Sequence, residues 1–203
     1  MSSGIVFVIS GPSGSGKGTV LKVLREMYNN FAVSVSATTR APREGEREGV
    51  EYFFKTREEF EALIKNEEVL EYTVYNGNYY GTLKSEAERI SASGKDLILE
   101  IEVDGGSQVK KLLGERCVTI ILTAPCPKEQ ERRLRDRGTE SDEVIARRLA
   151  RAREEMLEVP NYDYVVINET GKTAECAENV LAIIKAEHLR SSRVPDCIKE
   201  FFN

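Results

Sequence analysis

Residues 11–19, GPSGSGKGT, have the residue types and spacing of a loop that binds phosphate groups. In this pattern, glycines let backbone N–H groups turn inward, a following helix adds the positive end of its dipole, and a lysine adds charge for the β and γ phosphates. The alternative, a glycine-rich turn without ligand, is disfavoured because a buried strand precedes the loop and a helical pattern follows it. The expected phosphate site comprises Gly11, Pro12, Ser13, Gly14, Ser15, Gly16, Lys17, Gly18 and Thr19.

Gly18 stands where this pattern usually has Ser or Thr, so the hydroxyl often used on Mg²⁺ moves to Thr19. In this spacing, G-x-x-G-x-G-K-G-T, the loop resembles that of nucleoside monophosphate kinases. The resemblance implies a metal held largely by phosphate oxygens and water, in keeping with the slow dehydration of Mg²⁺.

A second group of anion-binding side chains follows in residues 36–46, SATTRAPREGE. Arg40 and Arg43 can both present forked donors to one phosphate monoester, and the hydroxyls of Tyr52 and Tyr80 can complete such a site. The alternative is a loop of solvated charges with aromatic residues in the core.

The elements that position these groups alternate between strands and helices. Strand patterns fall at 5–10, 31–39, 97–103, 118–124 and 164–168, and helical patterns at 19–28, 106–113, 128–137, 141–157 and 173–189. This alternation predicts an α/β fold with a parallel sheet and helices on both faces. Residues 40–84 break the rhythm, with short antiparallel strands expected around one helix at 57–66, so we predict a small mixed lobe inserted into the core. The tail after Pro195 is expected to add a short helix that packs through Ile198, Phe201 and Phe202.

Composition excludes several classes of protein. The 203 residues suffice for one buried core, no run reaches the about 20 apolar residues of a membrane span, and no secretion signal is evident, so we expect a cytoplasmic protein. The net charge of −5 disfavours nucleic-acid partners. Four scattered cysteines are expected to be thiols, and the single histidine, His188, expected at the surface, leaves no histidine-based metal cluster or Ser-His-Asp triad.

Six motifs in order, GPSGSGKGT, SATTRAPREGE, EYFF, LEY followed by GNYYGT, ILEIEVDG and RGTES, closely resemble the guanylate kinase family over about residues 4–189. The resemblance implies a P-loop NTPase-type fold and the reaction ATP + GMP ⇌ ADP + GDP with Mg²⁺, with dGMP as a further acceptor. It also implies a core (about 1–36, 85–125 and 158–189), a GMP-binding lobe (about 37–84), a helical lid (about 126–157) and a C-terminal tail (190–203).

Carried over by position, the resemblance gives the monophosphate to Arg40, Arg43, Tyr52 and Tyr80, and the base to Ser36, Glu71 and Thr82. Glu102 is a further GMP-site candidate, at the base or at Mg²⁺ waters. For Glu71 the reason is physical, because guanine presents N1–H and N2–H₂ as adjacent donors that one carboxylate can accept. Adenine has an unprotonated N1 there, which a carboxylate repels.

Glu100 and Glu102 are expected to end a buried strand on the same face, beside the phosphate loop. They are candidates for Mg²⁺ waters, together with Thr19. Glu102 stands where the family most often has Asp, Asp104 where many members have Gln, and Cys126-Pro127 where Pro-Ser is common.

Eight arginines lie between residues 132 and 153, and at least half are expected to form ordinary ion pairs on solvated helices. The resemblance implies that Arg133, Arg137 and Arg148 swing onto the transferring phosphoryl group, and that Asn168 lies near adenine. No catalytic base is required, because phosphoryl transfer depends on positioning and charge stabilisation.

Two other functions remain as alternatives. Guanylate-kinase-like domains of scaffold proteins bind phosphopeptides without catalysis, but they characteristically lack an intact phosphate loop, which this chain keeps. A kinase for another phosphorylated small acceptor is disfavoured by Glu71, Ser36 and Thr82. Oligomeric state and regulation are left open.

Overall fold

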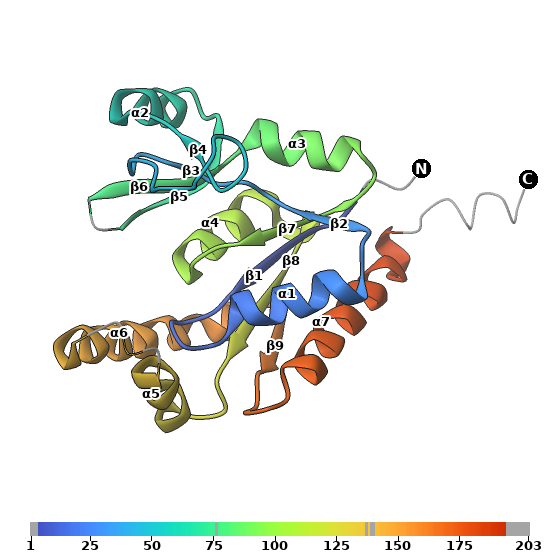
Figure 1. Ribbon diagram of the computed structural model, residues 1–203. Helices are drawn as coiled ribbons and strands as arrows, with labels where there is room; N and C mark the ends of the chain where they lie inside the picture. The colour runs from blue at the N-terminus through green and yellow to red at the C-terminus, as the bar shows by residue number, and fades with distance from the viewer. Residues whose placement is uncertain (1–3, 76, 137, 139–140, 194–203) are drawn as a thin grey trace, which may run out of the picture.

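A five-stranded parallel sheet forms the centre of the computed structural model, which describes residues 4–75, 77–136, 138 and 141–193 (Figure 1). The strand order is β2-β7-β1-β8-β9, and every neighbouring pair is parallel. All carboxyl ends therefore meet at one edge of the sheet, and the predicted fold class is confirmed. The strands are β1 (Val6–Ser10), β2 (Phe31–Val33), β7 (Asp96–Glu100), β8 (Cys117–Thr123) and β9 (Tyr164–Ile167).

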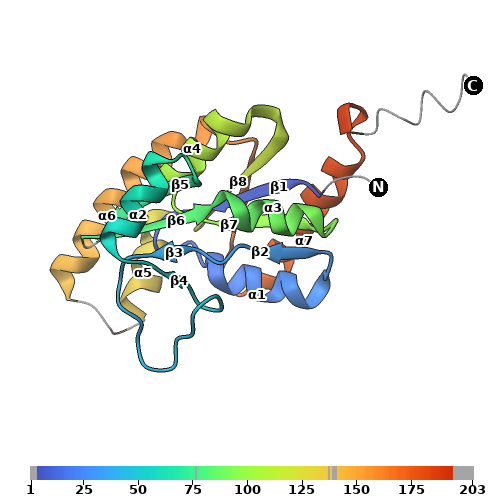
Figure 2. The same ribbon diagram turned by 90° about the horizontal axis from the view of Figure 1, so that it is seen from above.

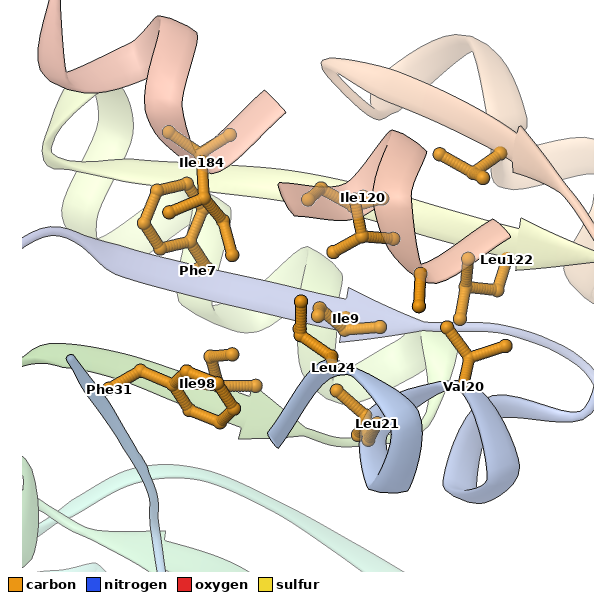
Figure 3. Close-up of a cluster of buried hydrophobic side chains, with 14 of the residues drawn as sticks. Phe7, Ile9, Val20, Leu21, Leu24, Phe31, Ile98, Ile120, Leu122 and Ile184 are labelled. Carbon is orange, nitrogen blue, oxygen red and sulfur yellow. The ribbon is translucent and has the colours of Figure 1, made fainter. Parts of the chain in front are cut away.

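Helices cover both faces of this sheet. Helices α1 (Lys17–Met27) and α7 (Thr173–His188) pack on one face, and α3 (Lys84–Ala92) and α4 (Val103–Leu113) pack on the other. Figure 2 shows α1 and α4 on opposite sides of the sheet. Alternation along β1 divides the core: Phe7 and Ile9 join the α1/α7 cluster, whereas Val8 joins the cluster that contains Val109 of α4. Figure 3 shows the first cluster, where Ile184 of α7 lies against Phe7.

A second, four-stranded sheet has the order β4-β3-β6-β5 and carries the predicted mixed lobe. Its strands are β3 (Ala37–Thr38), β4 (Phe53–Phe54), β5 (Val69–Tyr75) and β6 (Asn78–Leu83). The expected antiparallel pairing holds for β5–β6 and β3–β6 but is wrong for β3–β4, which is parallel. Helix α2 (Arg57–Lys65) begins with a capping box between Thr56 and Glu59, and its buried Phe60 stacks on Tyr79 at 5.1 Å between ring centroids.

The prediction of one strand over residues 31–39 is wrong, because the chain changes sheets within it. Ser34 N–H still donates to Ile98 of β7, at 3.2 Å, whereas the carbonyl of Ser36 already accepts from Phe53 N–H, at 2.9 Å. Alternation in sequence cannot reveal such a change of partner, since both halves are extended.

Two helices lie together beyond the carboxyl edge of the large sheet, α5 (Pro127–Asp136) and α6 (Asp142–Glu155) (Figure 1). Three short 3₁₀ helices follow other elements: η1 (Gly114–Arg116), η2 (Met156–Asn161) and η3 (Ser191–Arg193). The boundaries between core, lobe and lid stay a prediction.

The carboxyl end of α7 is tied to the sheet by its histidine. His188 was expected at the surface, but its side chain is only about one-third exposed, and its Nε2 lies 2.9 Å from Oδ2 of the buried Asp96. The predicted tail helix lies outside the described residues. Among those residues, no helix has the length and apolar content to cross a bilayer.

Candidate active site

The phosphate loop connects β1 to α1 in the conformation that its glycines permit. Gly14 and Gly16 both have φ near +86°, and Gly16 is the N-cap of α1. A Cβ on Gly11 would lie 2.2 Å from the carbonyl oxygen of Leu122, so this close approach to β8 also requires glycine. The loop therefore opens α1 at the carboxyl edge of the sheet, where the sequence predicts it.

Lys17, the first residue of α1, reaches across the mouth of the loop. Its Nζ lies 3.4 Å from the carbonyl oxygen of Gly11 and 3.3 Å from that of Ile101, just after β7. Both contacts are long bonds to neutral acceptors, so a phosphate oxygen could replace them as a stronger partner.

One cavity of about 400 Å³ joins the phosphate loop to the small sheet. It brings together many residues that the sequence predicts, and they come from strands of both sheets, from α6 and from the loops between: Ser13, Ser36, Tyr52, Glu71, Tyr80, Glu100, Glu102 and Arg148. Thr73, Tyr75 and Arg151 also line it and were not predicted. Thr73 and Tyr75 could have been found by alternation along β5, since they share the face of Glu71.

Glu71 is the buried acid of this cavity, with 4% of its surface exposed. Its Oε1 accepts a hydrogen bond from Thr82 Oγ1 at 2.8 Å. Burial raises the pKa of Glu71 to about 6, against the lowering effect of the bonds from Thr82. Gly105 of α4 gives the carboxylate its room, because a Cβ there would lie 2.6 Å from Glu71 Oε2.

The predicted phosphate-binding arginines lie beside a carboxylate that the sequence analysis missed. Glu46 accepts two bonds from Arg40 Nη2, at 2.8 and 2.9 Å, and one from the backbone N–H of Arg43. That backbone bond is the main reason for the lowered pKa of Glu46. Arg40 also lies over the ring of Tyr52, which contacts the Tyr80 ring edge-on. The sequence signal for Glu46 was its place in residues 43–46, REGE, close to Arg40 and Arg43.

The expectation that Glu102 ends a strand is wrong. Strand β7 stops at Glu100, and Glu102 is the N-cap of α4, where its carbonyl accepts from Gly106 N–H at 3.0 Å. Both acids still line the cavity. Beside the cavity, Arg151 of α6 pairs with Asp104 at 3.6 Å and with the buried Glu155 at 2.9 Å.

The predicted lid arginines have different surroundings. Arg133 lies on α5 and contacts the phosphate loop, with Nη1 3.4 Å from the Gly14 oxygen and 3.3 Å from the Ser15 oxygen. Arg148 on α6 lines the cavity. Arg137 lies outside the described residues.

Asn168 follows β9 and is buried against the loop. Its Nδ2 donates to the carbonyl of Ser15 at 2.8 Å, and a Cβ on Gly16 would lie 2.4 Å from that nitrogen. Among the described residues, its Oδ1 is a buried oxygen without a hydrogen-bond partner.

Comparison with known proteins identifies this arrangement. A model of the guanylate kinase family matches residues 3–187, which include both sheets and helices α5 and α6. This chain belongs to the guanylate kinase family. The resemblance in its motifs is thereby confirmed.

Individual guanylate kinases match the chain nearly end to end. The enzyme of Lactococcus lactis subsp. lactis (strain IL1403) is 49% identical over 191 residues, covering 94% of this chain and 92% of the relative. That of Bacillus anthracis is 48% identical over 198 residues, covering 97% of this chain and 95% of the relative. A crystal structure of guanylate kinase from Anaplasma phagocytophilum superposes with a TM-score of 0.74 at 34% identity, covering 95% and 90% of the two chains.

Proposed function

We infer that this chain transfers the γ-phosphoryl group of ATP to GMP, giving ADP and GDP in purine nucleotide recycling. The observation that carries this function, beside family membership, is the cavity that joins the phosphate loop to a buried carboxylate. The loop binds a nucleoside triphosphate, and the carboxylate selects a base that presents adjacent donors.

We propose that the GMP base lies against Glu71, with Thr82, Ser36 and Glu102 nearby. Glu71 Oε1 is already occupied by Thr82, so guanine N1–H and N2–H₂ would use the remaining acceptor capacity of the carboxylate. A carboxylate buried to this degree is costly without donors, so a base that supplies two of them is favoured over adenine.

The monophosphate of GMP is proposed to bind Arg40, Arg43, Tyr52 and Tyr80. Glu46 now accepts the donors of Arg40, so a phosphate there would take the place of that carboxylate. dGMP is a proposed second acceptor, since none of these groups addresses the ribose 2′-hydroxyl.

Transfer requires no base among the side chains, because a GMP phosphate oxygen attacks the γ phosphorus as the bond to the β-phosphate oxygen breaks. Lys17, Arg133, Arg137 and Arg148 are the proposed sources of positive charge, and Asn168 is proposed near adenine. The residues present also fit Mg²⁺, which would neutralise phosphate charge. It would be held by phosphate oxygens and water, with Thr19 and Glu100 beside the loop. A Cβ on Gly18 would lie 3.7 Å from Glu100 Oε1, so that acid is adjacent to the helix start.

The test of this function is ADP release measured with GMP, dGMP, AMP, CMP and UMP in parallel. Turnover with GMP and dGMP above all others supports it. Absence of ADP release with all five nucleotides would contradict it and favour the non-catalytic alternative or a kinase of another phosphorylated acceptor.

Replacing Arg148 with Ala should lower kcat about a hundredfold with little change in GMP affinity, because charge stabilisation of this kind acts mainly in the transition state. The same result is expected for Arg137→Ala. Arg147→Ala is the matched control, since Arg147 is an exposed neighbour on α6. Loss of GMP affinity in calorimetry with unchanged kcat would move Arg148 from the transfer step to the acceptor site.

Acid should weaken GMP binding through Glu71. The folded carboxyl has a pKa of about 6, raised by burial, and only its ionised form accepts both guanine donors. Below that pH its protonation alone should cost about tenfold in affinity per pH unit, while the GMP phosphate titrates in the same range. Calorimetric Kd values from pH 5 to 8 for the wild type and Glu71→Gln separate the two, because the phosphate contribution cancels in their ratio. The advantage of the wild type should shrink as pH falls, and a ratio independent of pH would contradict the assignment.

A further inference from the structure

Helix α5 packs directly against the outer, carbonyl side of the phosphate loop. Gln130 Nε2 donates to the carbonyl oxygen of Ser13 at 2.7 Å, and the residue is 8% exposed. Gly14 lies so close to this helix that a Cβ on it would meet Gln130 Cγ at 3.0 Å and the Gln130 carbonyl oxygen at 3.1 Å. The amide is oriented with its nitrogen toward the loop, since Ser13 offers only an acceptor there.

The next two carbonyls of the loop are held in the same way. Arg133 Nη1 lies 3.4 Å from the Gly14 oxygen and 3.3 Å from the Ser15 oxygen, and Asn168 Nδ2 donates to the Ser15 oxygen at 2.8 Å. Three consecutive carbonyls, those of Ser13, Gly14 and Ser15, therefore accept bonds from outside the loop.

Arg133 is itself fixed in this position. Its Nε donates to Glu129 Oε1 at 2.8 Å and its Nη2 to the Asn168 carbonyl at 2.7 Å. Glu129 also accepts from Arg132 and Thr170, and these bonds, with that of Arg132 first, hold its pKa far below its usual value. The guanidinium is thus held between α5 and the loop.

The bonds to these carbonyls affect phosphate binding because each peptide unit is planar, so a fixed carbonyl also fixes the orientation of the next N–H group. In a trans peptide the C=O of one residue and the N–H of the next point in opposite directions within one plane. Fixing the carbonyls of Ser13 and Ser15 outward therefore directs the N–H groups of Gly14 and Gly16 inward, whereas the N–H of Ser15 donates to the Pro12 carbonyl at 3.0 Å within the loop. Inward N–H groups are the donors that such a loop offers to phosphate oxygens.

We propose that Gln130 is a positioning residue for the phosphoryl donor, acting through the Ser13–Gly14 peptide. This inference rests on the proposed function, because the phosphate that it serves is that of ATP. Arg133 and Asn168 secure the two following peptides, so the loop meets its ligand with its donors already aligned. Gln130 on α5 therefore contributes to ATP binding indirectly, by holding the loop, and needs no contact with the nucleotide.

Two substitutions separate this role from simple packing. Gln130→Met keeps the length of the side chain but removes the donor, and Gln130→Glu keeps the shape but places an acceptor against the Ser13 carbonyl. ATP affinity by calorimetry and KM for ATP should weaken about five- to tenfold in the first and more in the second, at unchanged Kd for GMP. Gln108→Met is the matched control, because Gln108 Nε2 makes the same kind of bond to the Tyr72 carbonyl, at 3.0 Å, away from the loop. Its KM for ATP should equal that of the wild type.

Three results would overturn the proposal: unchanged ATP affinity in both variants, an equal weakening for ATP and GMP together with a lowered Tm, or a Gln130→Glu variant that binds ATP as well as the wild type does. Because ATP affinity is measured directly, the test does not depend on turnover. A wild type that binds ATP but releases no ADP with GMP would refute the proposed function and leave the role of Gln130 to be judged by affinity alone.

Discussion

Lys17→Ala should lower kcat about a thousandfold or more and leave the fold intact, because the charge on the donor phosphates would go uncompensated. Among the described residues, Lys17 contacts two carbonyl oxygens, at 3.3 and 3.4 Å, and its side chain belongs to neither core cluster. Its removal therefore takes away little that stabilises the protein. The measurement is kcat at saturating ATP and GMP, with Tm recorded for both proteins.

The matched control for Lys17→Ala is Lys22→Ala, since Lys22 lies on the exposed side of the same helix. It removes one positive charge from α1 at a position away from the loop, and its turnover should equal that of the wild type. The Kd for GMP should also be unchanged in Lys17→Ala, because the acceptor site lies on the small sheet. Near-normal turnover of Lys17→Ala would remove the phosphate loop from the mechanism.

Much of the fold could be predicted because its signals are local. The apolar runs that became β1 and β8 are buried almost throughout, as central strands of a parallel sheet must be. Residues 31–39 failed because the choice between two sheets depends on distant partners, Ile98 of β7 and Phe53 of β4. The end of β7 was misplaced for a related reason, since alternation persists through Glu102 although the helix cap has already begun.

The residues of the candidate site likewise fall into those that a local motif reveals and those that depend on distant contacts. Residues inside contiguous motifs, such as Lys17 and Arg40, could be named from sequence. In the structure Lys17 lies at the mouth of the loop, and Arg40 lies over the ring of Tyr52, which lines the cavity. Gln130 could not be named from sequence, because its importance comes from a bond to Ser13, which is 117 residues away in the chain. The sequence also could not show the contacts of Arg133, for which a movement onto the phosphoryl group is predicted. In this structure four hydrogen bonds hold its guanidinium against Glu129, Asn168 and the loop.

Glu71→Gln should reverse the polarity of one position in the acceptor site. Glu71 Oε1 accepts from the Thr82 hydroxyl at 2.8 Å, so the glutamine oxygen is expected to keep that bond and the amide nitrogen to take the other position. A guanine donor would then face an amide donor, and leaving that N–H unpaired costs about 1–3 kcal/mol. GMP should bind about ten- to a hundredfold more weakly. AMP should be rejected less strongly, because the amide can donate to adenine N1.

Gly105→Ala tests base recognition by Glu71 without changing Glu71 itself, because Gly105 of α4 lies next to its carboxylate. The added methyl would meet Glu71 Oε2 at 2.6 Å, which is closer than packed atoms approach, so the carboxylate must move. Because α4 accommodates Ala without backbone strain, the expected loss is again mainly in GMP affinity, with AMP little affected.

Lys111→Ala, an exposed change on α4, is the control for this helix. The decisive quantity is the ratio of kcat/KM for GMP to that for AMP, which should fall in both variants. A ratio equal to that of the wild type would mean that Glu71 does not recognise the base, and selection of GMP would then have to come from Ser36, Thr82 or Glu102.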